Sequence, residues 1–134
     1  MNNEKLIKKA ITAMNNAYTP YSRFNVGCSL LMKDGNIITG ANIENASYGL
    51  SNCAERSALF AAYSQGYRKD DIEVMVVVGD TKEVISPCGA CRQVINELVN
   101  DKTKIILTNL ENKQMVVDKK TLLPFGFTNS DMQK

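Results

Sequence analysis

Val74-Met75-Val76-Val77-Val78-Gly79 is a near-continuous apolar run close to the middle of the chain. An apolar run of this length without polar alternation predicts a strand that is buried on both faces. Two segments with helical periodicity flank it, and they begin with Asn52-Cys53-Ala54-Glu55 and with Pro87-Cys88-Gly89-Ala90-Cys91. A buried strand between two helices indicates a sheet covered by helices, and therefore an α/β fold.

Patterned segments on both sides of this unit complete the fold. Residues 4–17 repeat apolar side chains at helical spacing, and the turn sequence Lys33-Asp34-Gly35-Asn36 joins two strand-like runs. The expected elements, in chain order, are helix 4–17, strands 26–32 and 36–42, a loop at 43–52, helix 53–65, strand 74–79, helix 88–100, strands 104–108 and 114–117, a helical turn at 118–123 and a polar tail. This order predicts a mixed five-stranded sheet with helices on its faces.

Length and composition indicate one ordinary globular domain. The chain has 134 residues, enough for one buried core, and we expect residues 1–134 to form a single domain. Apolar residues make up 44% of the sequence and charged residues 22%, with a net charge of +2 and no basic stripe. This charge argues against nucleic acid as a partner. With no long apolar run and no signal-peptide core, we expect no membrane partner and a cytoplasmic location.

The cysteines are the first candidate functional residues. In a cytoplasmic protein, cysteines are more often ligands or catalytic groups than disulfides. Three of the four, Cys53, Cys88 and Cys91, lie in the two helix-start motifs. The fourth, Cys28, lies in an apolar strand-like run, where we expect a small buried hydrophobic side chain.

The spacing within the motifs limits where these side chains can meet. Cys53 and Glu55 are two residues apart, so in the middle of a helix they would point about 200° apart. Both can face one site only at a helix N-terminus. Cys88 and Cys91 are three residues apart and share a face on the first turn of the next helix. The positive ends of both helices favour thiolates, the form that binds zinc.

The expected site is therefore one zinc ion per chain, held by Cys53, Cys88 and Cys91. Three protein ligands leave the fourth tetrahedral position for water, as catalytic zinc requires. Glu55 is the expected catalytic residue, which takes a proton from that water and delivers it to the substrate. The same spacing, with histidine as the first ligand, is typical of zinc-dependent nucleobase deaminases.

Two other interpretations of the cysteines remain open. The Cys88-Gly89-Ala90-Cys91 sequence superficially resembles a thioredoxin-like redox pair at a helix start. A structural zinc ion would require a fourth ligand, for which Cys28 is the candidate, although its strand context fits poorly. The Cys53-Ala54-Glu55 partner on a second helix start favours catalytic zinc over both.

The chain contains no histidine, so three thiolates would leave the zinc site with a net negative charge. Stronger electron donation by thiolates should raise the pKa of the bound water, and a compensating cation is therefore expected. Arg56 lies three residues after Cys53, on the same side of the first helical turn. We hypothesise that Arg56 donates hydrogen bonds to a zinc-bound thiolate from outside the ligand set. Arg92, next to Cys91, is a weaker candidate for the same role.

With these residues in place, the chain resembles the short, homotetrameric type of cytidine deaminase almost from end to end. The matching segments are Tyr18–Phe24, Phe24–Gly27, Asn42–Asn45, Ala46–Tyr48, Asn52–Ser57, Ser86–Gln93 and Leu122–Pro124. The resemblance implies a three-layer α-β-α fold. It also implies that Cys53, Cys88 and Cys91 bind zinc and that Glu55 shuttles protons.

The resemblance assigns substrate contacts within one subunit. Asn42, Ile43 and Glu44 match the segment that binds the ribose hydroxyls, and an amide with a carboxylate can saturate a buried sugar hydroxyl. Phe24 would stack on or beside the pyrimidine. The backbone of Ala54 would help to hold the base.

The resemblance also implies that a neighbouring subunit of a homotetramer completes each site. The neighbour would contribute Ala46 and Tyr48, with Tyr48 near the 5′ end of the nucleoside, and a C-terminal aromatic ring over the base. Spacing from Pro124 favours Phe127 for this ring, with Phe125 as the alternative.

The expected reaction is hydrolytic deamination of free cytidine and 2′-deoxycytidine to the uridine products and ammonia, a step of pyrimidine salvage. Zinc-bound hydroxide would attack C4 while Glu55 shuttles protons. One rival is deamination of another cytosine-like compound or of a base in nucleic acid, against which the low net charge and the Asn42/Glu44 pair argue. A rival of another class is a thiol redox or zinc-storage protein.

Overall fold

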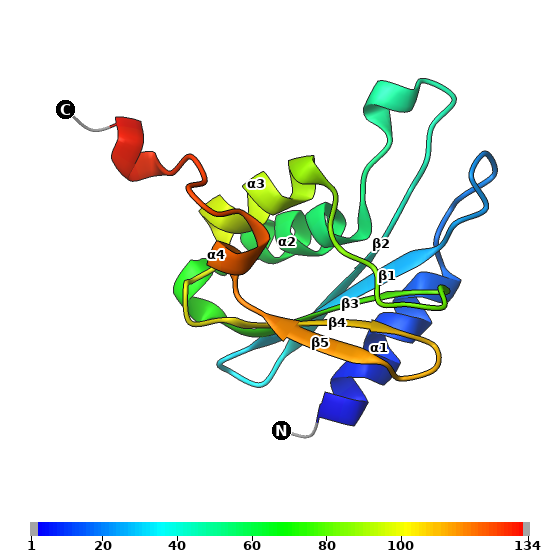
Figure 1. Cartoon of the computed structure of the whole chain (residues 1–134), viewed down its shortest axis with the longest axis horizontal. Coiled ribbons are helices and arrows are strands. Elements are labelled where there is room, and N and C mark those ends of the chain that lie inside the picture. The colour runs from blue at the N-terminus through cyan, green and yellow to red at the C-terminus, as the bar shows by residue number, and fades with distance from the viewer. Residues whose placement is uncertain (1–2, 133–134) are drawn as a thin grey trace.

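The fold is built on one five-stranded sheet with strand order β2-β1-β3-β4-β5 (Figure 1). It is seen in a computed structural model that describes residues 3–132. The strands are β1 (Val26–Met32), β2 (Ile37–Ala41), β3 (Ile72–Gly79), β4 (Lys104–Asn109) and β5 (Gln114–Val117). Only the β3–β4 pair is parallel, and the other three pairs are antiparallel. The predicted mixed sheet is confirmed.

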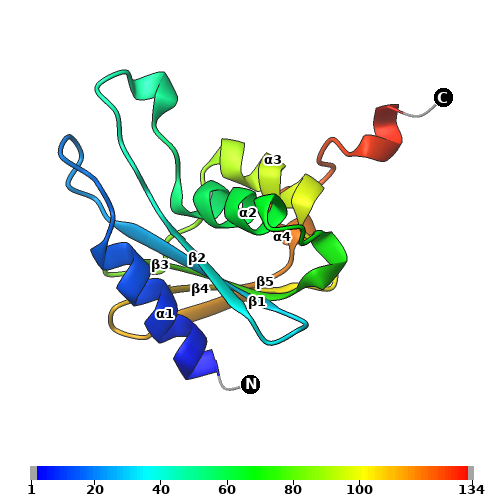
Figure 2. The ribbon, with the colours of Figure 1, turned by 180° about the vertical axis from the view of Figure 1, so that it is seen from behind.

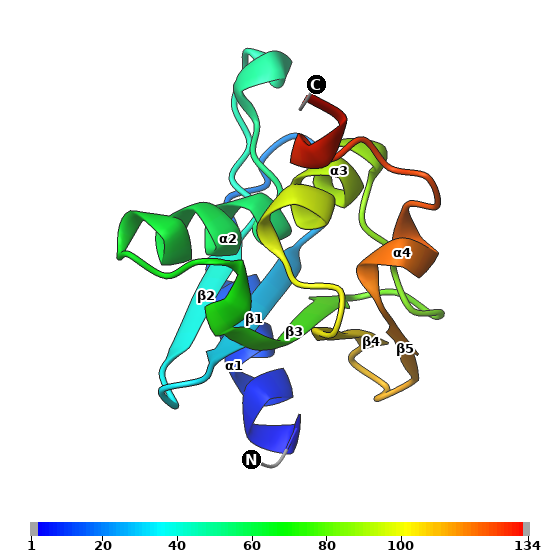
Figure 3. The ribbon, with the colours of Figure 1, turned by 90° about the vertical axis from the view of Figure 1, so that its left-hand side faces the viewer.

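Helices cover both faces of the sheet. They are α1 (Asn3–Asn15), α2 (Ala54–Ser64), α3 (Gly89–Leu98) and the short α4 (Lys119–Leu122). The helix α1 lies on one face, and α2 and α3 lie side by side on the other (Figures 2 and 3). The three-layer α-β-α fold expected from the resemblance is confirmed. Within residues 3–132, no helix has the length and apolar character needed to cross a membrane.

The central strand β3 supplies side chains to both layers of the core. Met75 and Val77 belong to the apolar cluster beneath α2 and α3. Val76 and Val78 belong to a separate cluster beneath α1. All four side chains are fully buried, as the unbroken apolar run predicts.

Two glycines allow helices to approach the sheet closely. A Cβ atom on Gly27 of β1 would lie 2.0 Å from the carbonyl oxygen of Ala10 in α1. A Cβ atom on Gly40 of β2 would lie 2.4 Å from the backbone nitrogen of Ala58 and 2.8 Å from the carbonyl oxygen of Ala54, both in α2. The absence of a side chain at Gly40 therefore fixes how deeply the first turns of α2 sit on the sheet.

The element boundaries differ from the sequence prediction at a few places. The helix α3 ends at Leu98 instead of residue 100, because Val99 turns into extended backbone and is buried in the core. The predicted loop at 43–52 contains a 3-10 turn at Tyr48–Leu50, and the polar tail contains another at Asn129–Met132. A third 3-10 turn, Lys69–Asp71, precedes β3. Single turns of this kind lack the periodicity by which longer helices are recognised.

Candidate active site

Three cysteine side chains meet where the N-termini of α2 and α3 converge. Cys53 is the N-cap residue of α2, and Cys88 is the N-cap residue of α3. Cys91 lies on the first turn of α3 and is buried. Their three Sγ atoms all lie within 4.8 Å of one another, and the Sγ atoms of Cys53 and Cys88 are 3.8 Å apart.

This cluster has the dimensions of a zinc site. Zinc–sulfur bonds of about 2.3 Å in tetrahedral geometry place ligand sulfurs about 3.8 Å apart. A disulfide bond would require about 2.05 Å, so the observed 3.8 Å separation of Cys53 and Cys88 is that of free thiols. The cluster therefore fits zinc, with three ligands from the protein and a fourth position for water.

Cys28 is not part of this cluster. Among the described residues, the group close enough to share a metal ion contains Cys53, Cys88 and Cys91 alone. Cys28 is fully buried in β1 and packs in the apolar cluster beneath α2 and α3. Burial raises the pKa of its thiol well above the ordinary value, with a smaller contribution from Glu55. The cluster thus lacks the fourth ligand that a structural zinc site would need.

The metal-free cluster concentrates negative charge on one sulfur. A hydrogen bond with Cys91 is the main reason that the pKa of Cys53 is lowered to about 5; burial opposes this shift, and the hydrogen bond from Arg56 adds to it. The same interaction with Cys53, together with burial, raises the pKa of Cys91. One thiolate is therefore already stable at neutral pH, held by a neighbouring thiol and a guanidinium.

Arg56 contacts the cluster directly. Its Nη2 atom donates a hydrogen bond of 3.3 Å to the Sγ atom of Cys53. This bond raises the pKa of the guanidinium, so its positive charge is secure. The Nε atom of Arg56 is buried and has no hydrogen-bond partner among the described residues. Arg92 has different partners, the carbonyl oxygens of Pro87 and Leu122.

Glu55 is the second residue of α2 and lies beside the cysteine cluster. Its side chain is buried, with 4% of the residue exposed. Burial is the main reason that its carboxyl pKa is raised, and the negative charge of Cys53 adds to the shift. A carboxyl group with a raised pKa beside a candidate metal site is suited to accept and return protons.

A cavity of about 360 Å³ opens onto the cluster and Glu55. Its lining residues are Phe24, Val26, Asn42, Cys53, Ala54, Glu55, Ile85, Ser86 and Cys88. The structure therefore brings Phe24, Asn42 and Ala54 together with Glu55 around one cavity. Val26, Ile85 and Ser86 were not among the expected contacts. Ser86 stands directly before the Pro-Cys-x-x-Cys motif, and this position in the sequence could have indicated that it lines the cavity.

The side chain of Asn42 shapes the wall of this cavity. Its Oδ1 atom accepts a hydrogen bond of 2.9 Å from the backbone nitrogen of Val26, and its Nδ2 atom donates one of 2.7 Å to the carbonyl oxygen of Phe24. The amide thus positions Phe24, a residue that is 41% exposed. The Nδ2 atom carries two hydrogens, and only one of them is donated to Phe24. The other can be donated to a ligand.

Ile43 and Glu44 lie next to the cavity but do not line it. Ile43 is half-exposed, and its backbone pairs with Tyr18 and Asn52. Glu44 accepts hydrogen bonds of 3.0 and 3.1 Å from the backbone nitrogens of Tyr21 and Ser22. The Ser22 hydroxyl also donates to it and is the main cause of its lowered pKa.

The residues expected to act in a neighbouring subunit are exposed and lie away from the cavity of their own chain. Ala46 is exposed, and Tyr48 is 74% exposed with its ring edge-on to Tyr21 at 5.9 Å. Phe127 is 56% exposed, and Phe125 is fully exposed. None of them lines the cavity that contains Glu55.

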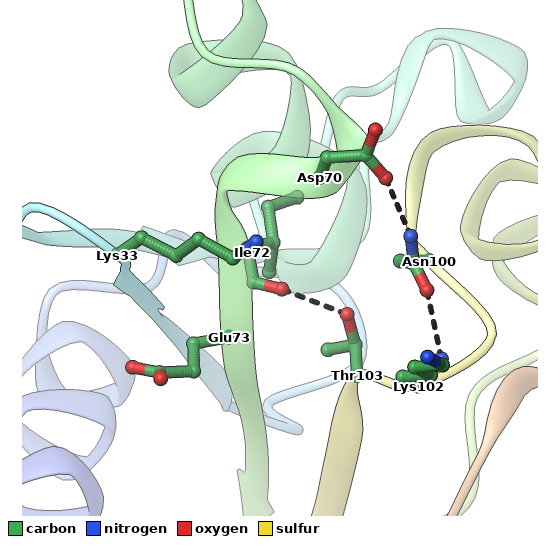
Figure 4. Close-up of a pocket in the computed structure, with 7 residues that line it drawn as sticks. All are labelled: Lys33, Asp70, Ile72, Glu73, Asn100, Lys102 and Thr103. Carbon is green, nitrogen blue, oxygen red and sulfur yellow. Dashed lines mark hydrogen bonds between the residues drawn. The ribbon is translucent and has the colours of Figure 1, made fainter.

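A second cavity, of about 410 Å³, lies at the other end of the central strands, where β3 and β4 begin (Figure 4). Its lining residues are Lys33, Asp70, Ile72, Glu73, Asn100, Lys102 and Thr103. Asn100 joins two loops here, because it donates to Asp70 and accepts from the backbone nitrogen of Lys102. Thr103 donates to the carbonyl oxygen of Ile72. These bonds hold the start of β3 and β4, and no thiol is present in the lining.

Comparison with known proteins gives consistent matches over most of the chain. The family model described as "Cytidine and deoxycytidylate deaminase zinc-binding region" matches residues 1–108. A cytidine deaminase from Halalkalibacterium halodurans is 57% identical over 132 residues, which cover 98% of each chain. A cytidine deaminase from Sporosarcina psychrophila is 46% identical over 132 residues, or 98% of this chain and 96% of the relative.

Solved structures agree with the sequence matches. The crystal structure of cytidine deaminase from Burkholderia pseudomallei matches with a TM-score of 0.92 and 47% identity, over 95% of this chain and all of the other. The cytidine deaminase structure from Mycobacterium tuberculosis matches with a TM-score of 0.78 and 34% identity, over 95% and 98% of the two chains. Sequence and fold therefore point to the same family.

Proposed function

The chain belongs to the cytidine and deoxycytidylate deaminase family, and from this premise we propose that it hydrolyses free cytidine and 2′-deoxycytidine to uridine and 2′-deoxyuridine with release of ammonia. The observation that carries the proposal is the cluster of three cysteine sulfurs beside a buried glutamate, in a cavity of about 360 Å³. In this role the enzyme serves pyrimidine salvage, and residues 1–134 act as one catalytic domain.

We assign one zinc ion per chain to Cys53, Cys88 and Cys91. Zinc, when bound, acts as a Lewis acid that lowers the pKa of a water molecule and supplies hydroxide near neutral pH. The cysteines contribute by holding this charge at one end of the cavity, where two helix N-termini favour the thiolate form. The short separation of the sulfur atoms supports this ligand set.

Glu55 moves the protons of the reaction. It accepts a proton from water and delivers it to N3 of the pyrimidine, while the water oxygen forms a bond to C4. Glu55 then carries a second proton to the exocyclic amine, the C4–N bond breaks, and ammonia leaves. The burial of Glu55 and its raised pKa support this role, because the carboxyl group must accept and release protons in one cycle.

The cavity wall positions the nucleoside. Phe24 stacks on or beside the base, and the backbone of Ala54 helps to hold it. Asn42 lines this cavity, Ile43 and Glu44 follow it along the chain, and the three residues bind the ribose. The hydrogen bonds that hold Glu44 and Asn42 in place support this assignment, since a preorganised site loses less entropy on binding.

Arg56 offsets the charge of the thiolate cluster. Its hydrogen bond to Cys53 withdraws electron density from one ligand, and this contact restores part of the Lewis acidity that histidine ligation would give. Its guanidinium also lies beside a negative charge at a partly buried position, where ion pairing is less screened than on the open surface.

We propose that four copies of the chain assemble and that each active site is completed by a neighbour. Ala46, Tyr48 and Phe127 would reach the adjacent cavity, with Tyr48 near the 5′ end of the nucleoside and Phe127 over the base. The exposure of large apolar side chains at Tyr48 and Phe127 supports the assignment, because such side chains gain most from burial at an interface. The other partner is the small nucleoside substrate, and the proposed location is cytoplasmic, where thiols stay reduced.

The direct test measures activity and metal content together. We expect purified protein to convert cytidine to uridine, seen by ultraviolet absorbance, with one zinc ion per chain. Glu55→Gln should keep its zinc and lose about 10²-fold or more in turnover. Glu111→Gln, which changes an exposed glutamate, is the matched control. Near-normal activity of Glu55→Gln would contradict the role of Glu55, and a reversible disulfide without cytidine turnover would favour a redox protein.

A further inference from the structure

The helix α3 holds the C-terminal segment, residues 122–132, here called the C-terminal arm. Gln93 Nε2 and Asn96 Nδ2 each donate a hydrogen bond of 2.9 Å to the carbonyl oxygen of Phe127. Asn96 is buried, so its amide is committed to this contact. The arm leaves α4 and passes along α3 (Figures 1 and 3). The helix that begins with the proposed zinc ligand Cys91 in its first turn therefore also holds the arm, through residues further along it.

Arg92, next to the ligand Cys91, connects the arm with the other ligand. Its Nη1 atom donates a hydrogen bond of 2.8 Å to the carbonyl oxygen of Leu122, at the start of the arm. Its Nε atom donates one of 2.8 Å to the carbonyl oxygen of Pro87, and its Nη2 atom donates to the Ser86 hydroxyl. Ser86 and Pro87 lead directly into Cys88. The donors of a guanidinium lie in one rigid plane, so the ligand segment and the arm are held at a fixed relative position.

The arm is held in a strained conformation that presents two aromatic rings. Phe125 has a φ of 59°, in the left-handed region that bulky residues rarely adopt. Such backbone persists only where its surroundings enforce it. Gly126 packs against the side chain of Asn96, and a Cβ atom there would lie 2.8 Å from Asn96 Nδ2. The exposed rings of Phe125 and Phe127 are therefore positioned by α3.

We propose that Arg92 is a positioning residue that couples zinc binding to the association of copies of this chain through the arm. The inference rests on the proposed function, from which the zinc site and the self-association are taken. Zinc fixes the segment before Cys88, and a neighbouring copy fixes the arm. The segment before Cys88 and the arm are both bonded to the guanidinium of Arg92. When one of these segments becomes ordered, the other therefore loses less conformational entropy on becoming ordered itself. The coupling is reciprocal, so assembly must tighten zinc binding by the factor by which zinc tightens assembly.

The experiment measures both halves of this coupling. Zinc affinity is determined by competition with a chelating dye. It is measured at protein concentrations above and below the dissociation constant of the assembly. Sedimentation velocity of reduced protein, zinc-loaded and chelator-treated, gives the effect of zinc on assembly. We expect a coupling factor of about tenfold in the unaltered protein. Arg92→Gln should weaken zinc binding about tenfold or more and bring the coupling factor to about one.

Two further variants separate coupling from general stability. Arg68→Gln removes a guanidinium that also donates to two backbone carbonyls, those of Tyr63 and Tyr67, but lies away from the cysteines, and it should keep the coupling. Gly126→Val pushes the arm away from Asn96 without altering the ligand segment. It should weaken assembly and, through the coupling, zinc binding as well.

The outcomes distinguish this inference from the proposed function. If the unaltered protein binds no zinc, the proposed zinc site is wrong, and if it stays monomeric, the proposed assembly is wrong. If it binds zinc and assembles, but its zinc affinity is the same in both states of assembly, the coupling is overturned. Full coupling in Arg92→Gln also overturns the role of Arg92. If Arg92→Gln does not fold, Gly126→Val decides, because zinc binding unaffected by release of the arm contradicts the proposal.

Discussion

The guanidinium of Arg56 donates a hydrogen bond of 3.3 Å to the sulfur of Cys53, within the first turn of α2. The donor and the sulfur therefore move together with one helix end. In a chain without histidine, this contact places a positive charge beside three sulfur atoms that would otherwise carry the negative charge alone.

The contact predicts how the enzyme responds when the charge is removed. In Arg56→Gln, the Cys53 thiolate loses its cationic partner, so zinc should be held about 10- to 100-fold more weakly or turnover should fall by a similar factor. We also expect the pH–rate profile to shift to higher pH, because the water at the zinc site would be less acidic. Zinc titration and the pH dependence of kcat measure these effects. An unchanged profile at full zinc content would show that Arg56 is only a surface charge.

Burial of Glu55 predicts a pH-dependent stability difference. Its carboxyl pKa in the folded state is raised above the ordinary value of 4.5. At pH values between the ordinary pKa and the raised pKa, the folded state therefore binds more protons than the unfolded chain. Stability contributed by this group is therefore lost as the pH rises through that window. Glutamine cannot ionise, and metal-free Glu55→Gln should gain stability relative to the parent as the pH rises above about 4.5. Urea unfolding across this range tests the sign, and a pH-independent difference contradicts it.

Cys28 provides the test against a structural zinc site. Cys28→Ala should keep one zinc ion per chain and cytidine turnover, and should lose about 1 kcal/mol of stability, as for one buried methylene-sized group. Cys53→Ala, Cys88→Ala and Cys91→Ala should each lose zinc. Metal analysis after gel filtration separates these results. Loss of zinc from Cys28→Ala would mean that the fourth position is occupied by protein.

The close approach of Gly40 to α2 predicts that the sheet sets the position of the helix that carries Glu55. The added methyl group of Gly40→Ala would meet the backbone of α2 at Ala54 and Ala58, which cannot move alone, at a cost of about 1–3 kcal/mol. The shift also displaces Glu55, so kcat should fall. Gly49→Ala is the control, because no atom lies within 4 Å of its added Cβ atom. Thermal unfolding should place this control within about 0.5 kcal/mol of the parent.

A shared active site predicts that two defective variants restore one another. Phe127→Ala should lose about tenfold in kcat/KM, as expected when a ring that stacks on a base is removed. Mixed assemblies with Glu55→Gln would contain sites that combine an intact Glu55 with an intact Phe127 from another chain. Activity should therefore rise on mixing after dissociation and reassembly. If only Phe125→Ala shows the loss and the complementation, Phe125 is the ring that covers the neighbouring site.

Much of the fold could be predicted because its strongest signals are local. The apolar run of β3 has no polar interruption, and Cys53 and Glu55 can face one site only from a helix end. The contact of Arg56 with Cys53 follows from the same first turn, so it could also be anticipated. These features depend on spacing along the chain, which the sequence contains in full.

The rest depends on contacts between distant segments. Ile85 lines the cavity because the loop after β3 folds back over Gly79, where an added Cβ atom would lie 2.8 Å from Ile85 Cδ1. The amide of Asn42 is engaged by the backbone of Phe24 and Val26, and no local pattern indicates this. The left-handed backbone of Phe125 stands beside Gly126 and Phe127, which contact Gln93 and Asn96 of α3, and its own residue type does not favour this conformation.

The two apolar cores share no residue, and the sheet stands between them. The core beneath α1 consists of Leu6, Ile7, Ala10, Met14, Leu31, Val76, Val78 and Ile106. Cys53, Glu55, Cys88 and Cys91 lie at the N-termini of α2 and α3, and these helices cover the other side of the sheet (Figure 2). Tolerance to amino-acid change should therefore differ between the two sides. A protein engineer seeking a heat-resistant variant can redesign the α1 side, while the chemistry constrains what can be changed on the other.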